Sequence, residues 1–120
     1  MKVGILSLGR ATFDIKFAHK NLKKIIKRLD NSNFKFIGSK KLLLDEKETY
    51  SEIKNLKKNN PTHILILQIT FTDASTILRV SEEFNMPISI WAIPEPRTGE
   101  RLRLNSFCGL NLASHTLGLN

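Results

Sequence analysis

The chain has 120 residues, of which 41% are hydrophobic and 25% are charged. These proportions are typical of one small soluble domain, and they exclude a chain that is disordered throughout. The single cysteine excludes an internal disulfide, and no hydrophobic run approaches the roughly 20 residues of a membrane span. We therefore expect a cytoplasmic protein without a membrane partner.

The formal net charge of +8 at pH 7 has two interpretations. It could attract nucleic acid or another anionic partner, or it could keep the surface solvated. Most of the lysines fall in two predicted helices, over residues 15–29 and 45–58. Aromatic residues do not interleave with them as a base-stacking platform would require. The pattern favours a solvated surface, and a nucleic-acid partner is the weaker hypothesis.

Four short hydrophobic runs predict β-strands. The first run is too short for the hydrophobic region of a signal peptide. A leucine patch, 42–44, is expected to pack on the sheet between the second strand and the second helix. The four runs are KVGILSL at 2–8, FKFIG at 34–38, THILILQIT at 62–70 and ISIWAI at 88–93.

Helices are predicted between the strands, because apolar residues recur there at spacings of three and four. Asp14 and Asp73 are placed to cap the first and third helices. The last helix is expected to begin at Asn105 or Ser106, and Gly118 is expected to end it. The predicted ranges are 15–29, 45–58, 72–84 and 105 or 106 to about 117.

Strict alternation of strands and helices predicts a parallel sheet with helices on both faces. Right-handed crossovers favour the strand order 2-1-3-4. The expected fold is therefore a three-layer α/β/α domain with a four-stranded parallel sheet, of the Rossmann or flavodoxin-like type.

Polar residues gather where the first, third and fourth strands end, in the segments 8–14, 68–73 and 91–103. Open parallel sheets bind ligands at this edge. Simpler roles are open for several of these residues: Asp14 and Asp73 as helix caps, and Trp91 as a core residue. The glycine patterns of dinucleotide and P-loop sites are absent from the sequence.

The segment PEPRTGERLR, residues 94–103, is the densest in charge. Its arginines could pair locally with Glu95 and Glu100, or they could bind a ligand or a neighbouring domain. Elsewhere the histidines are His19, His63 and His115, and none has a partner at metal-ligand spacing. Cys108 lies near a helix N-terminus, but with no base beside it in the sequence a buried packing role is favoured over a nucleophile.

Three stretches of the sequence together resemble the N-terminal domain of the L-fucose/L-arabinose isomerase superfamily. They are LGRATFDIKFA, LQITFTDAS and WAIPEPRTGERLRLNSFCGLNLASHTLG. The resemblance covers nearly the whole chain, and the last stretch carries most of its specificity. It implies a monosaccharide substrate, aldose–ketose isomerisation with Mn²⁺ or another divalent metal, and a homo-oligomer. It further implies metal ligands in later domains, so that this chain would hold none and would be inactive alone.

The resemblance implies sugar contacts at the strand ends, by Arg10 and Trp91 first and by Gln68 and Thr70 beside them. It implies no catalytic residue in this chain. Residues 1–104 would form the α/β domain, and 105–120 the helix that leads to a following domain. Four residues of the late loop are then candidates for interdomain or intersubunit contacts: Glu95, Arg97, Arg101 and Arg103.

An alternative is a stand-alone binding or regulatory module of the flavodoxin or receiver type. A receiver requires acidic residues after the first strand and an aspartate at the end of the third. This sequence has Arg10 and Gln68 in those places, which argues against the receiver.

Overall fold

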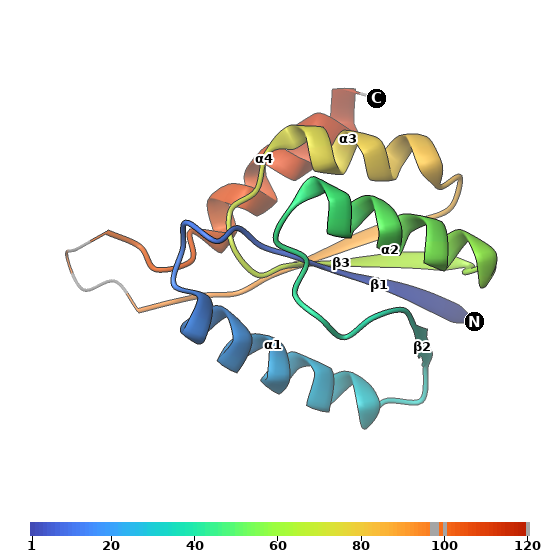
Figure 1. Cartoon of the computed structure of the whole chain (residues 1–120), viewed down its shortest axis with the longest axis horizontal. Helices are drawn as coiled ribbons and strands as arrows, with labels where there is room; N and C mark the ends of the chain where they lie inside the picture. The colour runs from blue at the N-terminus through green and yellow to red at the C-terminus, as the bar shows by residue number, and fades with distance from the viewer. Residues whose placement is uncertain (97–98, 100, 120) are drawn as a thin grey trace.

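The structure is a computed structural model that describes residues 1–96, 99 and 101–119. Its four strands form one parallel sheet in the order β2-β1-β3-β4, as predicted. The helices lie between and after the strands (Figure 1). In chain order the elements are β1 (Lys2–Leu8), α1 (Ile15–Asp30), β2 (Lys35–Ile37), α2 (Glu46–Lys58), β3 (His63–Gln68), α3 (Ala74–Glu83), β4 (Ile88–Ala92) and α4 (Ser106–Leu119).

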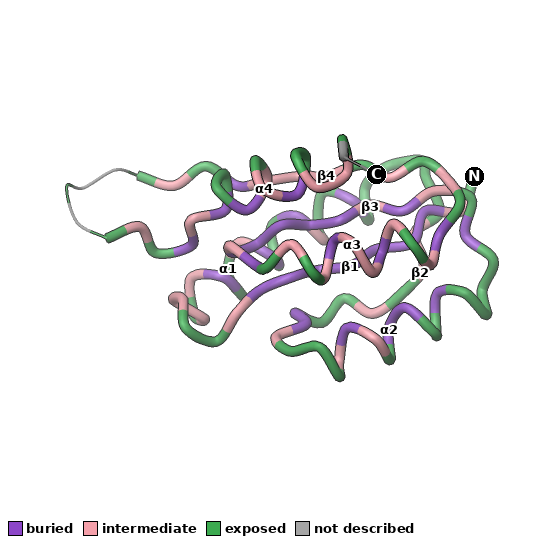
Figure 2. The backbone as a smooth tube through the Cα atoms, turned by 90° about the horizontal axis from the view of Figure 1, so that it is seen from above, coloured by how far each residue is buried: buried purple, intermediate pink, exposed green. Residues whose placement is uncertain are grey.

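The helices cover both faces of the sheet, with α1 alone on one side and α2, α3 and α4 on the other (Figure 1). Successive strand residues alternate between these faces. Leu6 and Ile66 therefore join the core under α2, α3 and α4, whereas Ile5 and Leu67 pack with α1. Figure 2 shows the buried backbone running through the middle of the sheet. The predicted three-layer fold is confirmed.

The leucine patch between β2 and α2 packs on the sheet, as expected. Leu42 and Leu43 are buried, and the Leu43 N–H donates to the Ser7 carbonyl at 2.8 Å. The Gly9 N–H in turn donates to the Leu43 carbonyl at 3.0 Å. These two bonds extend the sheet beyond the short β2 and bring the start of α2 beside the end of β1.

Two predictions about the last helix are wrong. The helix continues through Gly118 to Leu119, because Gly118 does not take the positive φ that a glycine terminator adopts. Cys108 is exposed rather than buried. The face of α4 that meets the sheet carries Ser106, Gly109 and Ala113, so position 108 faces outward.

Candidate binding site at the carboxyl ends of the strands

A polar pocket of about 240 Å³ opens where β1 and β3 end. The strand order places this point between two neighbouring strands whose crossovers leave in opposite directions, which is where doubly wound folds bind ligands. The first turns of α2 and α3 form two of its walls, so backbone N–H groups at two helix N-termini lie beside it. Its lining includes Gly9, Arg10, Asp45, Thr49, Thr72, Asp73, Ser75 and Thr76.

Arg10 is the cation of this pocket. Its backbone N–H donates to Thr70 Oγ1 at 2.9 Å, and its guanidinium forms an ion pair with Asp73. The Arg10 side chain keeps 39% of its surface exposed. The guanidinium is thus held at the mouth of the pocket while part of its surface remains accessible to a ligand.

Asp73 occupies the N-cap position of α3, as predicted, but its side chain accepts no capping hydrogen bond. Asp14 and Asp45, by contrast, accept from the N–H groups of Phe17 and Glu48 at 3.1 and 2.8 Å. The ion pair with Arg10 turns the Asp73 carboxylate away from its helix. The first turn of α3 therefore lacks a side-chain cap on the pocket side.

Gln68 and Thr70, the predicted sugar contacts after β3, are both fully buried. Gln68 Nε2 donates to the Thr70 carbonyl at 2.8 Å and to Thr72 Oγ1 at 2.9 Å. Thr70 in turn accepts from the Arg10 N–H. These contacts fix the backbone beneath the pocket, and through Thr70 they fix the position of Arg10.

Trp91, the other predicted sugar contact, lies apart from Arg10. It pairs with Leu67 across β3 and β4 and packs half-buried against the core on the α1 side of the sheet. It lines a separate hollow of about 230 Å³ with Asn21, Lys24 and Arg28 of α1. The structure therefore brings Arg10, Gln68 and Thr70 together and leaves Trp91 outside the pocket.

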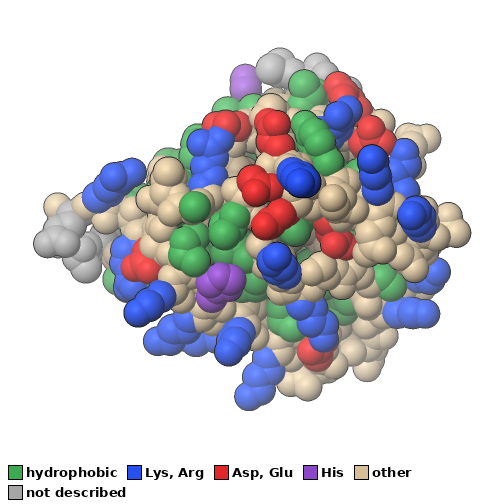
Figure 3. All heavy atoms as spheres, in the orientation of Figure 1, with side chains coloured by type: hydrophobic (Ala, Val, Ile, Leu, Met, Phe, Trp, Pro, Cys, Tyr) green, Lys and Arg blue, Asp and Glu red, His purple; other side chains and the backbone are tan. Residues whose placement is uncertain are grey.

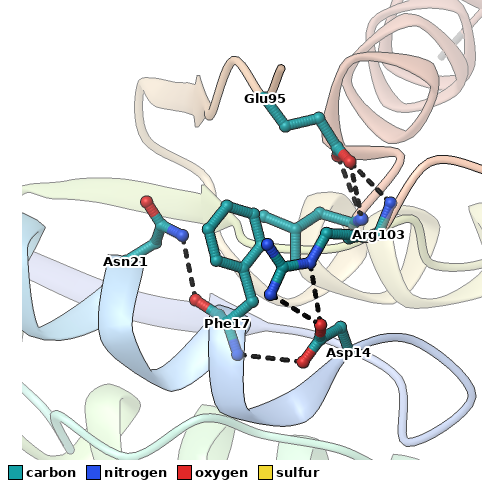
Figure 4. Close-up of polar contacts among 6 residues, drawn as sticks. Asp14, Phe17, Asn21, Glu95 and Arg103 are labelled. Atoms are coloured by element: carbon teal, nitrogen blue, oxygen red, sulfur yellow. Dashed lines mark hydrogen bonds and ion pairs between the residues drawn. The ribbon is translucent and has the colours of Figure 1, made fainter. Parts of the chain in front are cut away.

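Glu95 closes the loop between β4 and α4 (Figure 4). Its carboxylate accepts backbone N–H bonds from Arg103 at 2.6 Å, from Leu104 at 3.0 Å and from Asn105 at 2.9 Å. We call this arrangement the Glu95 clamp. The clamp occupies the carboxylate within the domain and sets where the chain returns to the sheet.

Arg103 is also engaged within the domain. Its Nε and one terminal nitrogen contact Asp14 Oδ2, each at 2.8 Å, and its guanidinium lies 3.7 Å from the centre of the Phe17 ring (Figure 4). The Phe17 N–H bond first, and the Arg103 hydrogen bond second, hold the pKa of Asp14 below its ordinary value. Arg101 is exposed, and Arg97 and Glu100 lie outside the described residues.

Sequence reasoning missed two parts of this region. Ser106, expected only as a possible cap, donates to the Gln68 carbonyl and accepts from the Ile93 N–H at 2.8 Å. It therefore joins β3, β4 and α4. The α2 wall of the pocket was also missed. Its residues Asp45, Glu46 and Thr49 follow the leucine patch rather than a strand end, and the patch gives no sign of leading α2 to β1.

The described residues include no group of three histidine, cysteine, aspartate or glutamate side chains that could hold a metal ion. A divalent cation would thus find no ligand set in the part of the chain that the structure covers. Within the same residues, no helix is long and apolar enough to cross a membrane.

Comparison with known proteins matches residues 4–120 to the family described as "Fucose/sulfoquinovose isomerase, N-terminal domain". The sulfoquinovose isomerase of Priestia megaterium is 31% identical over 110 residues, covering 92% of this chain and 25% of that protein. That of Clostridium sp. (strain MSTE9) is 29% identical over 118 residues, covering 97% of this chain and 26% of that protein.

The chain thus spans about a quarter of the length of these curated relatives. No solved structure is a significant match. The resemblance drawn from the three sequence stretches is confirmed: this chain belongs to the fucose/sulfoquinovose isomerase N-terminal domain family.

Proposed function

We propose that this chain is the substrate-binding domain of a metal-dependent aldose–ketose isomerase and is inactive by itself. The observation that carries the proposal is the Arg10 pocket, which lies at the carboxyl ends of the strands, where open parallel sheets bind ligands. The domain that contains it matches the isomerase N-terminal domain family over almost its whole length. A base and an acid are needed to move the proton between neighbouring carbons, and a metal usually stabilises the enediolate. The described residues of this pocket would bind the substrate and orient it.

Arg10 would act as the main ligand contact. Its planar guanidinium can donate two parallel hydrogen bonds to an anionic group or to neighbouring hydroxyls. On binding, a ligand oxygen would compete with Asp73 for the same donors, and the N–H groups at the start of α3 would support a negative charge. Gln68 and Thr70 would serve as positioning residues, while a sugar contact by Trp91 remains a separate prediction.

The substrate we propose is a monosaccharide that carries an anionic group. The curated relatives are named sulfoquinovose isomerases, and sulfoquinovose is a sulfonated aldose. A sulfonate and a guanidinium are complementary in charge and in hydrogen-bond geometry. A neutral aldose such as L-fucose would leave the Arg10–Asp73 ion pair in place.

The metal and the acid–base groups would come from outside this chain. The described residues include no ligand set for a metal ion. In the full-length protein, Mn²⁺ or another divalent ion would be held by other domains. A homo-oligomer would bring the Arg10 pocket to those groups, and the exposed Arg101 is a candidate contact.

The test is a chimera in which residues 1–120 replace the matching quarter of the Priestia megaterium enzyme. Arg10→Ala should lower kcat/KM for sulfoquinovose about 10- to 100-fold, the usual effect of losing a charged hydrogen bond. Arg79→Ala is the matched control, because Arg79 of α3 also forms a partly exposed ion pair, with Glu83, and lines neither the Arg10 pocket nor the Trp91 hollow. Equal activity of the two variants would refute the role of Arg10.

Two further measurements complete the test. L-fucose should show a smaller dependence on Arg10 than sulfoquinovose, because it lacks the anionic group. The isolated 120-residue chain with Mn²⁺ should not turn over either sugar. Turnover by the isolated chain would contradict the proposal that it is inactive alone.

A further inference from the structure

A second surface feature lies along one flank of α1, beside its buried face, and shares no lining residue with the Arg10 pocket. It is a groove of about 590 Å³ between α1 and the segment that follows β2. In Figure 3, lysine and arginine side chains gather along the edge of the molecule where Figure 1 places α1. The groove is lined by His19, Leu22, Lys23, Ile26, Lys27, Asp30, Asn31, Lys40, Lys41 and Leu42.

The groove combines an aliphatic floor with a cationic rim. The floor consists of the partly exposed Ile26 above the buried Leu22 and Leu42. The rim carries four lysines and one aspartate. That aspartate, Asp30, is already paired with Lys40 at 3.1 Å. Lys23 and Lys27 have no acidic partner among the described residues, so one wall of the groove presents uncompensated positive charge.

The length of the groove fits a helix. Its α1 wall runs from His19 to the C-cap residue Asn31, and the twelve steps between them rise about 18 Å at 1.5 Å each. This length matches about three turns of a partner helix. An amphipathic helix places apolar side chains in such a groove at spacings of three and four, and its flanking charges meet the rim.

We propose that this groove binds an acidic amphipathic helix of a protein partner. A single-stranded nucleic acid is disfavoured because the lining has no phenylalanine, tyrosine or tryptophan on which bases could stack. A second copy of this chain is disfavoured by its own helices. α2 contains three glutamates and four lysines, so it is not an acidic helix. α4 contains no acidic or basic residue apart from His115.

The experiment uses the isotope-labelled chain of 13.7 kDa and NMR titration. The probe is a synthetic peptide of about 15 residues, roughly four turns, with leucines on one helical face and glutamates on the other. A peptide of the same composition with the leucines dispersed is its control. The amphipathic peptide should shift the amides of Lys23, Ile26 and Leu42, and it should bind about tenfold more tightly than the dispersed one.

Reversing the charge of two groove lysines tests whether the peptide binds in the groove. The double variant Lys23→Glu/Lys27→Glu should weaken binding of the amphipathic peptide about tenfold, a typical cost of placing like charges across an interface. The matched control is Lys54→Glu/Lys58→Glu on α2, which makes the same change in net charge at the same spacing outside the groove. It should change binding less than about twofold.

Three results would overturn the proposal. The first is that the amphipathic peptide does not bind. The second is that the two peptides bind equally, or that the two double variants weaken binding equally, since either outcome would show only general charge attraction. The third is lysine-dependent binding to phosphatidylserine vesicles without binding to the peptide. That result would assign the groove to a membrane surface instead.

Discussion

Arg103 connects two segments that are 89 positions apart in the chain. Two of its side-chain nitrogens contact one oxygen of Asp14, and its guanidinium covers the ring of Phe17. The Asp14 N–H also donates to the Arg103 carbonyl at 3.1 Å. One residue therefore fixes the start of α1 through its backbone, its charge and its stacking on an aromatic ring.

Replacing Arg103 by methionine should raise the pKa of Asp14, which stays below its ordinary value because the Phe17 N–H bond remains. A lowered carboxyl pKa stabilises the folded chain above the unfolded pKa, and this stability disappears as the pH falls below about 4. The acid-labile part of the stability should therefore shrink in the variant. NMR titration of the Asp14 carboxyl measures the pKa, and an unchanged value would contradict the assignment.

Gly109 is a second residue whose identity the packing requires. A Cβ at this position would lie 3.0 Å from Gln68 Cγ and 3.1 Å from Gln68 Nε2. Gln68 is fully buried and hydrogen-bonded to Thr70 and Thr72, so it cannot yield without losing these bonds. The glycine thus permits α4 to approach the end of β3.

Gly109→Ala should lower the free energy of unfolding by about 1–3 kcal/mol, the usual cost of overpacking, despite the better helix propensity of alanine. Gly118→Ala is the matched control in the same helix, because a Cβ there would meet nothing within 4 Å. It should be neutral or stabilising by up to about 1 kcal/mol. Urea unfolding compares the two, and equal effects would show that contact with Gln68 is not limiting.

At the scale of elements, three helices begin after an aspartate but only two of these residues cap. Asp14 and Asp45 accept an N–H three residues on, whereas Asp73 pairs with Arg10. The sequence predicts the same capping role at all three positions, because N-cap preference depends only on the neighbouring residues. The difference arises from Arg10, a residue on another loop that no local pattern connects to Asp73.

Asp45→Ala should therefore cost about 1 kcal/mol of stability, the usual loss for a capping aspartate. Asp73→Ala should cost less, about 0–1 kcal/mol, because only an exposed ion pair is lost. Thermal or urea unfolding of both variants measures the difference. A larger loss at Asp73 would mean that its carboxylate does cap α3 in solution.

The whole molecule is organised around β1 and β3, the only described strands with a neighbour on both sides. β2 has three residues at one edge of the sheet, and β4 is only partly buried. Leu6, Ile66 and Leu67 have no exposed surface. Exchange of their amides requires the opening of most of the core, whereas the edges can open locally.

Hydrogen exchange followed by NMR should consequently be slowest in the centres of β1 and β3 and markedly faster in β2. β4 should lie between them. The order follows from the number of paired neighbours rather than from residue type, since all four strands are rich in isoleucine, leucine or phenylalanine. Protection of β2 equal to that of β1 would contradict this hierarchy.

The fold was predictable because its information is periodic and local. Alternating strands and helices predict a parallel sheet, and the apolar stripe of α1 predicts its buried face. The site was only partly predictable. Arg10 could be placed at the correct edge, but the close packing of Gln68 depends on α4, and Thr70 is bound by the loop of Arg10. The separation of Trp91 depends on the side of the sheet that it faces.

The Glu95 clamp should make this chain tolerant of changes in length between β4 and α4. Because the carboxylate gathers the N–H groups of Arg103, Leu104 and Asn105, both ends of the intervening loop are fixed at a single point. Extra residues between them would cost only the slow logarithmic entropy of a longer loop, about 0.6 kcal/mol per doubling. Engineered insertions should therefore be accommodated there without disturbing the sheet.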